Sequence, residues 1–232
     1  MAGLRLDHLA IVQDDFALRA DWSAEPGGRV AVIGPSGAGK STLLHTIAGF
    51  MPPSEGAVLW QGARIDALPP GQRPLSILFQ DQNLFPHLTV AQNLGLGLDP
   101  TLRRVDWRAV EAVLERVGLS GLGTRRPAQL SGGQQSRAAL ARALLRQRPL
   151  LLLDEPFAAL GPALKAEMLD LVDALAGDAL VLMVTHDPAD ARRFARDTVL
   201  VAEGVAAPPV PTAALFADPP PALAAYLGGA AF

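Results

Sequence analysis

The sequence predicts an α/β fold with a mainly parallel sheet. Apolar runs of strand length alternate with segments whose apolar residues recur at helical spacing, which is typical of parallel strands covered by helices. A glycine-rich stretch, residues 34–42, lies between one such strand and helix, and a later apolar run ends in Asp154 and Glu155. Because α/β folds bind ligands beyond the carboxyl ends of their strands, both features predict a binding site there.

The expected elements follow in order along the chain. Two strands joined by a turn open it and predict an N-terminal antiparallel β subdomain. Strands are expected at 4–12, 16–22, 29–33, 57–60, 75–79, 150–153, 180–185 and 198–202. Helices are expected from the glycine-rich stretch to Gly49, at 89–98, 107–117, 163–175 and 188–196, and from Ser131 to a point before Pro149.

The 232 residues are expected to form one large domain. We divide it into an α/β core at about 1–81 and 147–205, an inserted α-helical subdomain at about 82–146, and a C-terminal tail at about 206–232. The tail is rich in Pro and Ala, with a short helix expected at 222–227. It is too short for a further folded domain.

The composition excludes several kinds of site. Cysteine is absent, which removes disulfides, iron–sulfur clusters and thiolate zinc sites. The net charge of −3 gives no sequence-wide basic signature, so we expect no nucleic-acid partner. We find no signal peptide and no uncharged apolar run of about 18 residues, so work at a membrane would need a partner. We expect His8, His45 and His87 to be structural or surface residues.

The glycine-rich stretch fits the phosphate-binding pattern G-x-x-x-x-G-K-[ST] at every fixed position. Glycines let the backbone curl so that successive N–H groups point at an anion, and the following helix adds its positive dipole end. Lys40 would reach the β- and γ-phosphates, and the Ser41 hydroxyl would bind Mg²⁺. This stretch predicts a P-loop NTPase core, and its residues are Gly34, Pro35, Ser36, Gly37, Ala38, Gly39, Lys40, Ser41 and Thr42.

Asp154 and Glu155 follow the apolar run 150–153. Asp154 suits coordination of Mg²⁺, directly or through water. Glu155 is placed to orient the water that attacks the γ-phosphate, or to take its proton. Without the phosphate loop upstream, the same two acids would equally indicate the end of a strand and the cap of the next turn.

A second anion site is predicted where a helix begins with Ser131, Gly132, Gly133 and Gln134. Alone, a Ser-Gly-Gly segment is an ordinary helix start. One chain rarely needs two anion sites for one triphosphate, whereas a head-to-tail dimer does, with the phosphate loop of one subunit facing Ser131 of its partner. We therefore expect a homodimer.

In order and spacing, five segments resemble the ABC-transporter ATPase family: 34–42, Gln80, 130–134, 150–155 and 185–187. The resemblance covers about residues 4–205. It implies ATP and Mg²⁺ as ligands, a homodimer that closes on two ATPs, a transmembrane permease, and a periplasmic solute-binding protein as an indirect partner. It also implies a peripheral location at the cytoplasmic face of a bacterial inner membrane.

Two site residues come from this resemblance. It implies that Gln80 couples nucleotide binding to the permease and contacts Mg²⁺ or the attacking water. It implies that His186 hydrogen-bonds the γ-phosphate. Taken alone, Gln80 would be an ordinary glutamine at a strand end and His186 a loop residue.

Finer features, at 47–50, 78–98 and 154–160, resemble the ATP-binding subunits of bacterial thiamine importers. None of these residues would touch thiamine, so the cargo rests on the resemblance. Importers of iron, sulfate, polyamines or sugars share the five segments and remain alternatives. A further alternative is a soluble ABC ATPase acting on DNA or ribosomes. Such a protein would usually need a coiled-coil insertion or tandem ATPase halves, and this sequence shows neither. The segment 131–134 argues against a P-loop kinase or GTPase.

Two positions depart from the family pattern. Gly161 stands where the family usually has Asp, in a loop that crosses the dimer interface. We hypothesise that the missing carboxylate weakens communication between the two ATP sites. No aromatic residue stands at 11–13, where one usually stacks on adenine. Phe16 is the nearest candidate for that role, although its alternation with Leu18 also predicts core packing.

Overall fold

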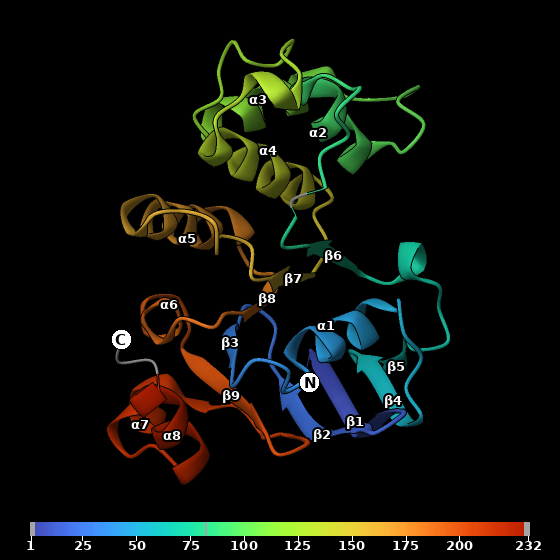
Figure 1. The fold of residues 1–232 in the computed structure, drawn as a ribbon. Coiled ribbons are helices and arrows are strands. Elements are labelled where there is room, and N and C mark those ends of the chain that lie inside the picture. The colour runs from blue at the N-terminus through green and yellow to red at the C-terminus, as the bar shows by residue number, and fades with distance from the viewer. Residues whose placement is uncertain (1–2, 82, 230–232) are drawn as a thin grey trace.

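The computed structural model describes residues 3–81 and 83–229 and has the expected α/β architecture (Figure 1). The sheet runs in the order β5-β4-β1-β2-β10-β9-β3-β8-β7-β6, with β11 paired to β9. The strands are β1 Leu4–Gln13, β2 Phe16–Ala24, β3 Arg29–Ile33, β4 Glu55–Trp60, β5 Ala63–Arg64, β6 Leu75–Leu78, β7 Leu150–Asp154, β8 Leu180–Val184, β9 Asp197–Ala202, β10 Val205–Ala206 and β11 Val210–Pro211.

Eight α-helices are assigned within the described ranges. They are α1 Lys40–Ala48, α2 Val90–Leu98, α3 Trp107–Arg116, α4 Gly132–Leu145, α5 Pro162–Ala176, α6 Pro188–Phe194, α7 Thr212–Ala217 and α8 Pro221–Gly229. Two 3₁₀ turns, Pro70–Gln72 and Pro127–Gln129, complete the helical elements. Within residues 3–81 and 83–229, no helix combines the length and the apolar character that crossing a membrane requires.

The half of the sheet that carries the predicted site is parallel. Strands β9, β3, β8, β7 and β6 are neighbours in that order, and each adjacent pair is parallel. Every residue of β7 and β8 is buried, so both strands are covered on both faces. Continuous apolar runs of this kind are what a doubly covered parallel sheet requires.

The N-terminal strands form the antiparallel half. Strand β1 pairs antiparallel with β2 and with β4, and a tight turn at Asp14 and Asp15 joins β1 to β2. Asp14 has a φ of 47°, a left-handed conformation that Asp adopts more readily than most residues. Strand β10 then pairs parallel with β2 and links the two halves.

Helices α2, α3 and α4 gather at one end of the molecule, beyond β6 and β7 (Figure 1). Side-chain caps fix all three starts: Thr89 and Ser131 begin capping boxes, and Asp106 caps α3. The three helices share an apolar cluster that includes Val90, Leu94, Val110, Leu114, Ala138 and Leu145. The predicted boundary of the helical insertion, residue 82, lies outside the described residues.

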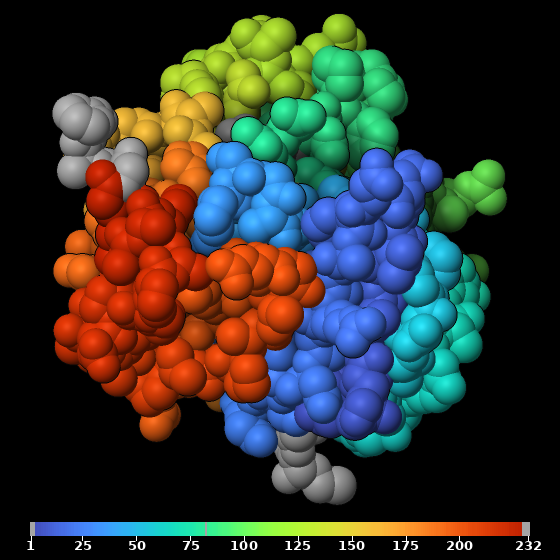
Figure 2. Space-filling view, turned by 60° about the horizontal axis from the view of Figure 1, so that its bottom comes forward, coloured from blue at the N-terminus to red at the C-terminus, as the bar shows by residue number. Residues whose placement is uncertain are grey.

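The chain after β9 holds more structure than the single short helix that the sequence predicts. It forms β10, β11, α7 and α8, and Leu215 and Leu223 are buried in the core beside α6. Two-residue strands and a six-residue helix are too short to show a periodicity in the sequence. Pairing with β2 and β9 defines the two short strands. In Figure 2 these residues, in red, form one continuous surface with the orange residues that precede them.

Arg73 fastens the carboxyl end of α1 to the chain that follows it. The residue is 2% exposed, and its guanidinium meets the negative end of the helix dipole. A Cβ added at Gly49 would lie 2.5 Å from Arg73 Nε, so this approach needs glycine just after the helix. The guanidinium donates to the carbonyl oxygens of Thr46 and Ile47 (2.8 Å each), Leu68 (3.0 Å) and Asp66 (2.9 Å).

We expect Arg73→Leu to lower the free energy of unfolding by about 3 kcal/mol, because four carbonyl oxygens lose their charged donor. Chemical denaturation followed by circular dichroism would measure the change. Arg108→Leu is the matched control, since Arg108 is exposed on α3 and its loss should cost less than about 0.5 kcal/mol. Equal stabilities for the two variants would contradict the role assigned to Arg73.

Candidate functional site

The predicted site segments meet at one edge of the sheet. Strands β3, β8, β7 and β6 run in the same direction, and each ends immediately before a predicted segment. The phosphate loop follows β3, His186 lies two residues beyond β8, Glu155 follows β7, and Gln80 lies two residues beyond β6. The register aligns Asp154 with Val184, so segments distant in sequence become neighbours.

The phosphate loop needs glycine at two positions. Gly34 has a φ of 151°, and an added Cβ would lie 2.0 Å from the carbonyl oxygen of Val201. Gly39 has a φ of 97°, and an added Cβ would lie 2.4 Å from Cζ of Phe16. Phe16 is half-buried and packs on the core, so its ring supports the loop from the start of β2.

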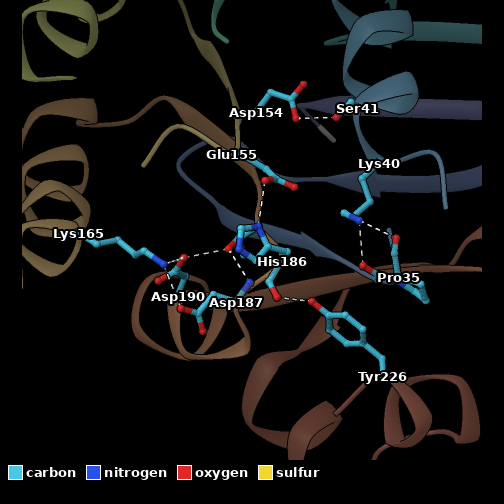
Figure 3. Close-up of polar contacts among 12 residues, drawn as sticks. Pro35, Lys40, Ser41, Asp154, Glu155, Lys165, His186, Asp187, Asp190 and Tyr226 are labelled. Carbon is cyan, nitrogen blue, oxygen red and sulfur yellow. Dashed lines mark hydrogen bonds and ion pairs between the residues drawn. The ribbon is translucent and has the colours of Figure 1, made fainter. Parts of the chain in front are cut away.

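Lys40, the first residue of α1, lies inside the loop (Figure 3). Its side chain is buried, and Nζ donates to the carbonyl oxygens of Gly34 at 2.9 Å and Pro35 at 2.8 Å. Burial lowers the pKa of Lys40, while the carboxylates of Glu155 and Asp154 oppose that shift. An ammonium group withdrawn from water and held by neutral carbonyls is a strong site for an anion.

Ser41 and Asp154 face each other. Ser41 Oγ donates to Asp154 Oδ1 at 2.8 Å, and the carboxyl group is buried at the end of β7. Burial raises the pKa of Asp154, against the hydrogen bond from Ser41. His45, expected to be structural or at the surface, also reaches this group: its Nε2 lies 3.5 Å from Asp154 Oδ2, outside hydrogen-bond geometry. The sequence did not predict this contact, because a single histidine one helical turn after Ser41 matches no recognised pattern.

Glu155 and His186 form a second pair. Glu155 Oε2 and His186 Nδ1 share a hydrogen bond of 2.9 Å. Glu155 has a φ of 44°, a left-handed conformation that non-glycine residues seldom adopt. Its backbone N–H donates to the carbonyl oxygen of Val184, which fixes the turn after β7 against β8.

A polar network that the sequence did not predict supports the loop that carries His186. Lys165 of α5 forms ion pairs with Asp187 at 3.0 Å and Asp190 at 3.3 Å. Thr185 donates from Oγ1 to Asp190 and accepts from the backbone N–H of Asp187. Burial lowers the pKa of Lys165, but the two carboxylates outweigh it and the net shift is upward. Asp187 also caps α6, because its carboxylate accepts from the backbone N–H of Ala189.

The segment 131–134 lies apart from the phosphate loop of its own chain, at the start of α4. Ser131 Oγ accepts from the N–H of Gln134, and Gln134 Oε1 accepts from the N–H of Ser131. Within the described chain, the side chain of Ser131 hydrogen-bonds only inside this cap. A Cβ at Gly133 would lie 2.5 Å from Leu164 of α5. Ser131 and Gly132 are exposed, as a surface that meets another molecule must be.

Gln80 is exposed in the turn after β6, next to the carboxyl end of β7.

Gly161 occupies the N-cap position of α5 with a φ of −66°, and a Cβ added there would meet no heavy atom within 4 Å. A side chain is therefore tolerated at position 161.

Comparison with known proteins identifies relatives of this chain. The pattern of the ABC transporter family matches residues 18–158. The thiamine import ATP-binding protein ThiQ of Cereibacter sphaeroides is 67% identical over 229 residues, which cover 97% of this chain and 99% of that protein. The protein of the same name from Ruegeria sp. is 60% identical with the same coverage.

Solved structures resemble this chain as well. A dimeric bacterial ABC transporter cassette superposes with a TM-score of 0.75 at 28% identity, covering 90% of this chain and 98% of the cassette. A bacterial Atm1-family ABC exporter with ATP bound superposes with a TM-score of 0.83 at 26% identity. The match covers all of this chain and spans 42% of the exporter chain. The chain belongs to the ABC transporter family, as one of its ATP-binding subunits.

Proposed function

We propose that this chain is the ATP-hydrolysing subunit of a bacterial importer that takes up thiamine. The observation that carries the activity is the meeting of Lys40, Ser41, Asp154, Glu155 and His186 at one edge of a parallel sheet. The cargo is supported by the 67% identity, over nearly the full length of both chains, with a thiamine import ATP-binding protein.

The residues present fit a magnesium site. Mg²⁺ prefers hydroxyl and carboxylate oxygens, and Ser41 Oγ and Asp154 Oδ1 already lie 2.8 Å apart at the mouth of the loop. When bound, the metal would neutralise charge on the β- and γ-phosphate oxygens. Burial makes the ionised form of the Asp154 carboxyl less stable, and a bound cation would offset this effect. Gln80, at the neighbouring strand end, is the proposed third contributor.

Each of the other site residues is assigned either to ATP binding or to ATP hydrolysis. Lys40 exchanges its two carbonyl partners for β- and γ-phosphate oxygens, while the loop amides of 34–42 hold the remaining phosphate charge. Glu155 orients the attacking water or takes its proton. His186, held by Glu155 through Nδ1, presents the other side of its ring to the γ-phosphate. Phe16, beside Gly39, is the proposed support for the adenine base.

Two copies of the chain would complete each site. Ser131, Gly132 and Gln134 stand at an exposed helix start, where the amides and the positive dipole end favour a phosphate from the partner subunit. Two ATPs would then join the subunits head to tail, and hydrolysis would release them.

The permease would bind in a groove of about 480 Å³ between the end of α1, β6 and α4. Phe50 and Phe85, two of its lining residues, are among the exposed large apolar side chains. Arg142 and Arg146 add positive charge to the same groove. Exposed aromatic and arginine side chains are enriched where proteins bind one another. We place the chain at the cytoplasmic face of the inner membrane, attached through the permease, with a periplasmic binding protein as the indirect partner.

Thiamine uptake tests the cargo. Lys40→Ala should reduce ATP affinity roughly 100-fold or more, because the charged phosphate contact is lost. In the native cell it should abolish uptake of labelled thiamine. Arg116→Ala, an exposed α3 residue, is the control and should transport normally. Normal thiamine uptake in cells that carry Lys40→Ala would indicate a different cargo, namely iron, sulfate, a polyamine or a sugar.

Glu155→Gln should bind ATP with near-normal affinity and lose turnover by roughly 100-fold or more, because the amide cannot accept the proton of the water. ATP should then hold the variant as a dimer, which light scattering after gel filtration would detect. A variant that stays monomeric at saturating ATP would exclude the proposed dimer.

Gly161→Asp should raise the cooperativity of ATP hydrolysis if the missing carboxylate weakens communication between the two sites. The open space at this position means that the substitution itself should not destabilise the fold. Gly161→Asn is the matched control, since it offers the same helix cap without the charge. The Hill coefficient for ATP decides: equal values for the unsubstituted chain and both variants would refute the hypothesis.

A further inference from the structure

The C-terminal chain is anchored on the helix that follows the predicted catalytic histidine. Leu223 of α8 is fully buried in the core cluster that also contains Ala191 and Phe194 of α6. The guanidinium of Arg192 lies 4.4 Å from the ring centroid of Phe216 of α7. These contacts fix α7 and α8 against α6, and so place α8 beside the turn that precedes α6.

Tyr226 extends from α8 to that turn. Its hydroxyl donates to the backbone carbonyl oxygen of His186 (Figure 3). Tyr226 is the single tyrosine of the chain, and its ring is half-buried against the same core cluster. Burial, followed by the nearby carboxylates of Asp187 and Glu155, raises the pKa of Tyr226, so the phenol keeps its proton as a donor at neutral pH.

His186 is therefore held from two sides. Its ring meets Glu155 through Nδ1, and its carbonyl accepts from Tyr226. The neighbouring backbone is fixed on the other side, where Asp187 N–H donates to Thr185 Oγ1 at 3.0 Å. The side chain of His186 is half-exposed, so packing alone does not set its direction.

We propose that Tyr226 is a positioning residue, which holds the backbone of His186 so that the imidazole stays directed at Glu155 and the γ-phosphate. The inference rests on the proposed function. It gives the C-terminal helix a part in hydrolysis that the five motifs do not include. Nucleotide binding should be independent of it, because Lys40 and the loop amides take their support from α1 and β3.

The test is Tyr226→Phe, which removes the hydroxyl and keeps the ring. We expect kcat for ATP to fall roughly 2- to 10-fold, the loss of one neutral hydrogen bond, with KM unchanged. In a His186→Ala background the same substitution should change the residual kcat no further, because the imidazole that it positions is gone.

Thr212→Val is the matched control. It removes a buried hydrogen bond of 2.8 Å between Thr198 and Thr212, in the same C-terminal chain but at the start of α7. If Thr212→Val lowers kcat as much as Tyr226→Phe, the tail acts only through general stability and the proposal is wrong. An unchanged kcat for Tyr226→Phe also overturns it.

A second measurement does not depend on ATPase activity. With ¹⁵N-labelled histidine, the ring signals of His186, assigned from His186→Ala, should move in Tyr226→Phe, while those of His87 stay in place. If the wild-type chain does not hydrolyse ATP, the proposed function fails, and this spectrum still decides whether Tyr226 positions His186. Unmoved His186 signals would overturn the inference.

Discussion

Asp154 faces Ser41 because β7 and β3 run in the same direction on either side of β8. The parallel register is the constraint on which the site depends. It brings residues more than a hundred positions apart to one edge, at a separation set by strand spacing rather than by loop length. The loops that follow these strands are short, so little conformational freedom remains to be lost when a ligand binds.

The electrostatics of this edge are set by burial. Lys40 is withdrawn from water and its pKa is lowered, whereas the pKa of the buried Asp154 is raised. Each ionised form is therefore less stable than it would be in solvent, although the two charges partly compensate each other. A triphosphate with a bound Mg²⁺, as proposed, would supply the opposite charge to both groups at once. The same low solvent exposure that disfavours the free site strengthens its contacts with such a ligand.

Much of this arrangement could be predicted from the sequence, because it follows from motifs and caps that are local in the chain. The stretch 34–42 leads from β3 into the first turn of α1, the caps at Ser131 and Asp106 begin their helices, and the family assignment is confirmed by the matched relatives. The contacts of Lys165 with Asp187, and of His45 with Asp154, could not be predicted, because they join residues from different elements without a spacing rule. The roles of all the predicted site residues in binding and catalysis, those of Gln80, His186 and Phe16 included, stay predictions.

Arg73 affects local unfolding of α1. By holding the last carbonyls of α1 to a segment more than twenty residues downstream, it prevents that helix from fraying at its carboxyl end. The other end is closed by the loop around Lys40. Local openings that expose amides near helix ends are therefore suppressed here, and α1 should exchange its amide hydrogens with deuterium only through large-scale unfolding. We therefore expect the helix that follows the phosphate loop to belong to the most slowly exchanging unit of the protein.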